Sequence, residues 1–160
     1  MTIRGPGVLF AAWFLHDLEE GFAFPATSNT LADRTGFDRL RVRKDQSWVA
    51  IGMMGIIIGA ACWRGHRTRG RSRLYRAALA GLEAHVYTHL GASLLHGGYT
   101  AGVATALPVM LPGAIIARRE LRRSHTPLRM RDLVRGVSLL IPGAVICHAL
   151  ARLFLRRTER

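Results

Sequence analysis

The sequence has few lysines, few acidic residues and few cysteines. Of its 160 residues, 23 are Lys or Arg and 10 are Asp or Glu, a formal net charge of +13, and Lys44 is the single lysine. Cys62 and Cys147 form no CxxC pair, so the sequence predicts neither a disulfide framework nor a thiolate zinc site. The apolar share of 49% is too high for a disordered basic tail.

Apolar residues gather in long stretches that arginine-rich segments separate. Five stretches predict membrane-spanning helices, over residues 5–24, 47–63, 77–95, 100–117 and 136–155. The expected fold is therefore an all-α polytopic transmembrane bundle that forms one domain over residues 1–160. Pro108, Pro112 and Pro142 lie within these stretches and are expected to kink the helices.

The basic connections predict an orientation. Residues 64–76 hold six arginines and residues 118–135 hold seven, so the positive-inside rule places both, with the N-terminus, on the cytoplasmic side of a bacterial plasma membrane. Five spans would then put Arg156, Arg157 and Arg160 outside. A four-span alternative, with a tilted, re-entrant or interfacial last segment, therefore stays open. Residues 25–46 are expected to form an outer loop, either an amphipathic cap or a plain solvated segment.

The arginines also indicate which partners to expect. They are expected to contact anionic lipids of the bilayer. Nucleic-acid binding is not expected, because the loops lack the interleaved aromatic residues that a nucleic-acid surface needs.

Ionisable side chains in the predicted spans are the candidates for function, since each costs about 2.5–3.5 kcal/mol to insert. At about 100° per residue, Glu19 lies at about −60° and Glu20 at about +40° from His16, so the three share one helix face. The full set of candidate metal ligands is His16, Glu19, Glu20, Glu83, His85, His89, His96 and His148.

The third predicted span carries a stripe of imidazoles. The directions of His85, His89 and His96 differ by only about 40°, whereas Glu83 points about 140° away from them. His148, in the last span, is interpreted either as a ligand or as a buried polar residue. Carboxylates together with imidazoles suit iron, manganese or zinc. A structural hydrogen-bond network and a proton or ion path are the alternatives to a metal site.

The motif His16-x-x-Glu19-Glu20, followed by Glu83, His85 and His89 and then by residues 99–102, 105–107 and 111–113, resembles the HXXEE-domain family of small integral membrane proteins. The resemblance covers about residues 13–117. It implies a membrane location and a metal site, and some relatives are thought to act as membrane di-iron oxidases in natural-product pathways.

Three hypotheses follow. The first is a non-haem di-iron oxidase or oxygenase that acts on a small or lipophilic substrate with a redox partner; Glu19 or Glu20 would bridge the ions, and His16, His85 and His89 would be terminal ligands. The second is a zinc-type hydrolase with Glu20 as general base. The third is a non-catalytic transporter or metal-binding membrane protein.

Overall fold

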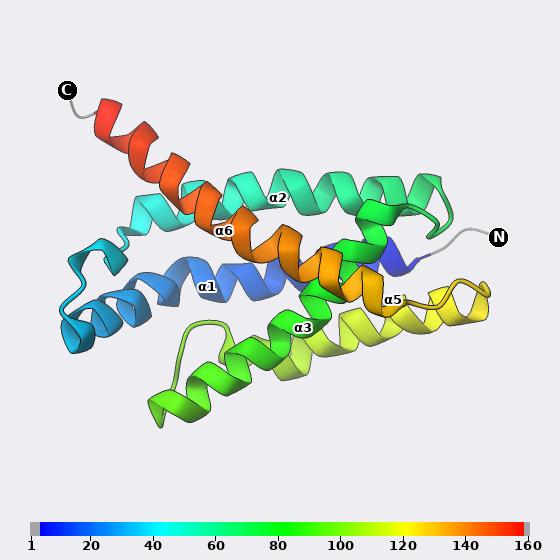
Figure 1. Cartoon of the computed structure of the whole chain (residues 1–160), viewed down its shortest axis with the longest axis horizontal. Coiled ribbons are helices and arrows are strands. Elements are labelled where there is room, and N and C mark those ends of the chain that lie inside the picture. The colour runs from blue at the N-terminus through cyan, green and yellow to red at the C-terminus, as the bar shows by residue number, and fades with distance from the viewer. Residues whose placement is uncertain (1–3, 159–160) are drawn as a thin grey trace.

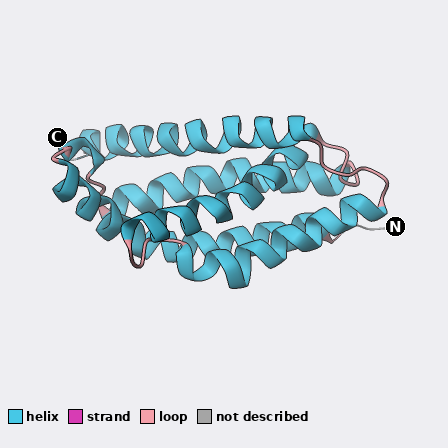
Figure 2. Cartoon of the chain, turned by 60° about the horizontal axis from the view of Figure 1, so that its bottom comes forward, coloured by secondary structure: helices cyan, strands magenta, loops and turns pink. Residues whose placement is uncertain are grey.

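The computed structural model describes residues 4–158, and every regular element in that range is a helix (Figure 2). The long helices are α1 (Gly5–Thr35), α2 (Lys44–Arg67), α3 (Arg73–His96), α5 (Leu111–Arg123) and α6 (Met130–Thr158). The short ones are η1 (Asp38–Leu40), α4 (Val103–Thr105) and the π-helical turn η2 (Ala106–Met110), which continues directly into α5. The predicted all-α class is confirmed.

The helices run alternately along the long axis of the molecule (Figure 1). α1, α3 and α6 lead away from the end at which the chain starts, and α2 and the α4–α5 segment lead back to it. The two arginine-rich connections therefore lie at one end together with the N-terminal end of α1, and α6 finishes at the opposite end. This places the two connections on the same side, as the charge pattern predicts.

Two helices are long and apolar enough to cross a membrane, α2 and α6. Only 33% of the apolar window in α2 and 17% of that in α6 is buried, whereas the core helix of a soluble protein would be mostly buried. Membrane association is thus suggested, but the predicted set of about five spans is not confirmed. α1 carries too many charged residues for an apolar membrane span, among them Asp17, Glu19 and Glu20. α5, with only 13 residues, is too short to cross a membrane.

The expected outer loop over residues 25–46 is wrong in its first half, because α1 continues through Pro25 to Thr35. The helix ends where Gly36 takes a left-handed conformation, with φ of 73°. Its last turns are held by polar contacts with the following segment: the Ser28 hydroxyl donates to the Leu40 carbonyl, and Asn29 accepts from the backbone N–H of Val42. These contacts hold the segment against α1, although residues 36–41 remain exposed to solvent.

The helices contain all three prolines at which kinks are predicted. Pro108 lies in the π-helical turn, where an extra residue widens the backbone, and Pro112 follows as the second residue of α5. α6 continues as a helix on both sides of Pro142.

α6 makes a close crossing with α3 at paired glycines. A Cβ added at Gly136 would lie 2.3 Å from the Ala77 carbonyl oxygen and 2.5 Å from the Gly81 nitrogen, so only glycine fits there. One turn before Gly136 on α6, Asp132 pairs with Arg76 of α3 at 2.7 Å, and both side chains are largely buried. The second half of α6 then packs on α2.

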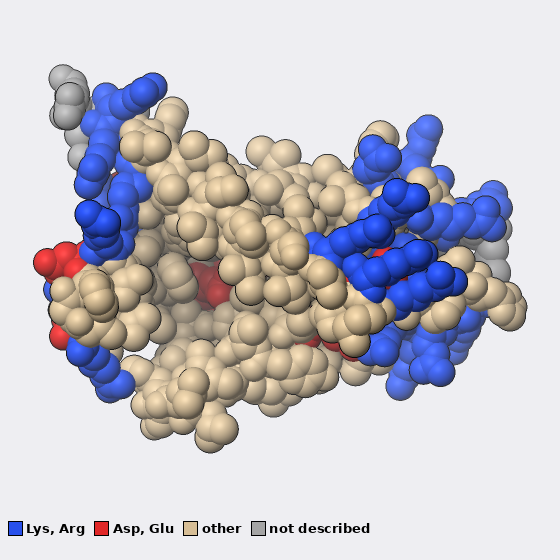
Figure 3. All heavy atoms as spheres, viewed as in Figure 1, with Lys and Arg blue, Asp and Glu red and all other residues tan. Residues whose placement is uncertain are grey.

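The surface is divided into a broad apolar belt and two basic ends (Figure 3). Large apolar side chains are exposed on the belt, among them Phe22 at 67%, Ile56 at 75% and Val145 at 64%. Exposed apolar side chains that gather on one surface are typical of an interaction or membrane-contact site.

Candidate metal centre

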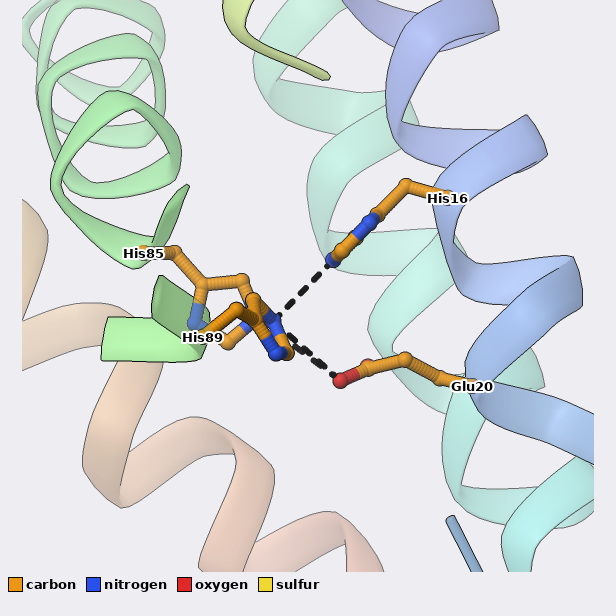
Figure 4. Close-up of side chains that lie close together, drawn as sticks. All are labelled: His16, Glu20, His85 and His89. Carbon is orange, nitrogen blue, oxygen red and sulfur yellow. Dashed lines mark hydrogen bonds and ion pairs between the residues drawn. The ribbon is translucent and has the colours of Figure 1, made fainter. Parts of the chain in front are cut away.

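Four potential ligand atoms from α1 and α3 converge at one point midway along the bundle. They belong to His16, Glu20, His85 and His89, and all lie within 4.8 Å of one another. His16 and Glu20 project from successive turns of α1, and His85 and His89 project from successive turns of α3 (Figure 4). The i, i+4 spacing on each helix therefore supplies two ligands from the same face.

The distances around His89 Nε2 are close to those between ligands of one ion, whereas the most widely separated ligand atoms of the cluster, up to 4.8 Å apart, would have to move closer together on binding. His89 Nε2 lies 3.1 Å from His16 Nε2, 2.9 Å from His85 Nε2 and 3.4 Å from Glu20 Oε1, and His85 Nε2 lies 4.0 Å from Glu20 Oε1. Metal–nitrogen bonds of about 2.0–2.1 Å in a tetrahedron separate neighbouring ligands by about 3.3–3.4 Å.

The protons on two of the imidazoles can be assigned from their outer partners. His89 Nδ1 lies 2.8 Å from the Ala101 carbonyl, which can only accept, so Nδ1 donates. His16 Nδ1 lies 2.9 Å from Thr105 Oγ1, and that hydroxyl gives its own proton to Glu19 Oε2. His16 Nδ1 must therefore donate to Thr105. In a neutral ring this leaves Nε2 as the lone-pair nitrogen of both His16 and His89.

The proton on the His85 ring can be assigned in the same way. Its Nδ1 lies 3.2 Å from Thr88 Oγ1, and the Thr88 hydroxyl donates its proton to the His85 carbonyl. The hydroxyl is thus an acceptor for His85 Nδ1–H, and the His85 lone pair is on Nε2.

Three lone pairs and a carboxylate oxygen consequently face one another without a proton between the imidazoles. This arrangement is repulsive unless a cation lies between them. Metal-binding histidines characteristically donate their second nitrogen to a carbonyl, carboxylate or hydroxyl, as all three do here. The donor set and its outer partners could therefore hold a metal ion.

The profile of a protein family described as "Protein of unknown function with HXXEE motif" matches residues 8–117. The chain belongs to this HXXEE family. No curated protein and no solved structure matches the chain.

Only two of the three defining residues of the HXXEE motif lie in the cluster. His16 and Glu20 converge with the α3 histidines, whereas Glu19 lies outside it and accepts hydrogen bonds from the α4 region. Glu19 Oε1 accepts from the Tyr99 hydroxyl at 2.6 Å and from two backbone N–H groups, and Oε2 accepts from the N–H and hydroxyl of Thr105. The carboxylate thus caps the N-terminal end of α4.

Gly102 lets the segment before α4 approach the imidazoles. Its φ is +85°, and an added Cβ would lie 2.4 Å from His89 Cε1 and 3.0 Å from His16 Cε1. No other residue type fits this position without displacing both rings. The backbone at Ala101 and Gly102 is therefore one wall of the site.

The other predicted ligands lie elsewhere. Glu83 pairs with Arg118 at 2.6 Å, which agrees with its predicted direction away from the imidazole stripe. His96, in the last turn of α3, contacts the guanidinium of Arg34. The His148 ring lies 5.1 Å from that of Phe24.

Sequence reasoning missed Thr105 and Gly102 as parts of the site. Both lie in the 99–107 region on which the family resemblance partly rests, and this was the available signal. The bonds from Glu19 to this region connect it to the motif on α1.

Proposed function

We propose that this HXXEE protein is an integral membrane metalloprotein that binds one divalent transition ion through His16, Glu20, His85 and His89. The observation that carries the proposal is the convergence of three Nε2 atoms and one carboxylate oxygen, while the Nδ1 atom of each ring faces an outer acceptor. A hydrogen-bond network is a weaker explanation, because such a network would place a proton between the facing nitrogens.

A membrane location is supported by the dimensions of the apolar belt. Between Lys44 and Arg64, α2 holds one charged residue, Asp45, and the distance from Lys44 to Arg64 along the helix is about 30 Å, the thickness of the hydrocarbon core. Exposed apolar side chains on α6 and α2 would then contact acyl chains. With arginine-rich connections at one end, the positive-inside rule favours a cytoplasmic location for that end and for the N-terminus.

For the reaction we propose oxidation of a lipophilic substrate at a single iron or manganese ion. Imidazole and carboxylate ligands suit these metals, and a bound iron ion would supply the one-electron chemistry that reaction with dioxygen requires. A pair of irons has less support, because both oxygens of Glu19 accept hydrogen bonds from the α4 region instead of facing the cluster. A redox partner would return electrons where the substrate does not supply them.

One observation favours a zinc-dependent hydrolase as the second candidate. Glu20 lies farther from the α3 imidazoles than these lie from their nearest ring: its Oε1 is 3.4 Å and 4.0 Å from the His89 and His85 nitrogens, against 2.9–3.1 Å from His89 to each of the other two imidazoles. A carboxylate in this position is able to act as a general base toward a water molecule instead of binding the ion directly.

Metal analysis of the purified protein in lipid nanodiscs tests these proposals. About one iron or manganese per chain, with oxygen uptake when a lipophilic electron donor is added, supports the oxidase. About one zinc without oxygen uptake supports the hydrolase. Absence of metal after growth with each of the three ions would refute the metalloprotein and favour the non-catalytic alternative.

A further inference from the structure

The four side chains of the cluster are unequally covered. His16 is fully buried and His89 is 7% exposed, whereas the side chains of Glu20 and His85 are 18% and 36% exposed. The convergence point is therefore closed on the side of His16, Thr105 and the Ala101–Gly102 backbone and open on the side of Glu20 and His85.

The open side lies at the middle of the apolar belt. Along α1, Glu20 lies about 24 Å from Arg4 and about 21 Å from Arg34, the basic residues at the two ends of the helix. The hydrocarbon core of a bilayer reaches only about 15 Å to either side of its midplane. A chain centred in the bilayer thus holds Glu20 near the midplane, with both basic ends at the headgroups.

The path of α6 leaves this side uncovered. α6 packs on α3 near Gly136 and on α2 near Ala151, and the second half of α3, which carries His85 and His89, diverges from it (Figure 1). Figure 3 shows a hollow in this face of the apolar belt, with an acidic side chain at its base. Ile141 and Val145 of α6 are exposed at 58% and 64%.

From the coverage and the depth of the cluster, we propose that its open side faces the acyl chains and admits a neutral, lipophilic ligand laterally from the bilayer. The inference rests on the metalloprotein proposed above and adds the route by which its lipophilic substrate enters and the requirement that this substrate be neutral. A charged or strongly hydrated ligand would have to cross about 15 Å of hydrocarbon to reach the same position, which is costly.

The test compares two thiols that bind a metal through the same atom. The full chain in nanodiscs is loaded with Co²⁺, whose visible spectrum reports its ligands, and sulfur coordination adds a charge-transfer band. Decanethiol enters from the lipid, and 2-mercaptoethanesulfonate, which is smaller but charged, stays in water. The His96→Ala variant, altered outside the cluster, serves as the matched control.

The proposal predicts that decanethiol produces the band in both proteins, and that the sulfonate produces none at a 100-fold higher concentration. A band of equal intensity with the sulfonate would show an aqueous route and overturn the lateral one. Co²⁺ binding without a response to either thiol would overturn it as well, because no open position would exist. A protein that binds no Co²⁺ overturns the metal site itself, so the two failures are distinguishable.

Discussion

Replacement of Thr105 by valine should weaken metal binding although Thr105 touches no ion. Its hydroxyl accepts from His16 Nδ1 at 2.9 Å and donates to Glu19 Oε2 at 2.5 Å. Valine has nearly the same shape but no hydroxyl, so the His16 Nδ1–H loses its acceptor in a fully buried site. The ring is then free to move its proton to Nε2, the nitrogen that must be bare to bind the ion.

The size of the effect follows from the cost of an unsatisfied buried donor, about 1–3 kcal/mol, which corresponds to about 5- to 150-fold in metal affinity. Loss of an outer partner of a metal-binding histidine usually costs 10- to 100-fold, in the same range. Serine at this position keeps the hydroxyl, so Thr105→Ser should retain affinity within a few-fold of the native protein.

Competition titrations against a chelator of known affinity measure the difference between the two variants. Nitrogen NMR of the metal-free protein separates the tautomers, and the Nδ1–H form of His16 should be lost in Thr105→Val and kept in Thr105→Ser. Equal metal affinity of the valine and serine variants would refute the assignment of Thr105 as a positioning residue for His16.

Three further predictions concern the site and its support. Gly102→Ala should lower metal affinity more than tenfold while circular dichroism shows unchanged helix content, since the new Cβ would collide with the His16 and His89 rings. Native affinity would argue against a close approach of the Gly102 backbone to these rings. Asp132→Ala should destabilise the fold by about 3 kcal/mol, seen as a lower unfolding temperature, because the buried Arg76 guanidinium loses its counter-ion and keeps only the Thr126 and Pro127 carbonyls as partners; an unchanged temperature contradicts this. Acidification should release the metal reversibly in equilibrium dialysis only below about pH 5, because each imidazole must be deprotonated to bind and burial disfavours its protonated form; complete release already at about pH 6 would speak against buried imidazole ligands.

The helical segments of the fold were predictable from their apolar patterns. The five expected stretches match α1, α2, α3, the α4–α5 segment and α6, and the two basic connections lie at one end as their charge indicates. The extension of α1 to Thr35 was not predictable from local signals, because Pro25 usually ends a helix. Its continuation depends on tertiary contacts such as that between Ser28 and Leu40.

Helix periodicity also predicted much of the cluster. It placed His16 and Glu20 on one face and His85 and His89 on another, which is how the structure combines them. It could not separate Glu19 from Glu20, because both lie within about 60° of His16. The difference arises from the 99–105 segment, whose approach to α1 depends on the turn at Gly102 and has no periodic signal.

Metal content of single-residue variants tests the central claim most directly. The native protein and the controls Glu83→Ala, His96→Ala and His148→Ala should each carry about one ion per chain. His16→Ala and His89→Ala should carry none while they keep native helix content and elution volume. Full metal content in both of these variants, or its loss in a control, would contradict a centre built from α1 and α3.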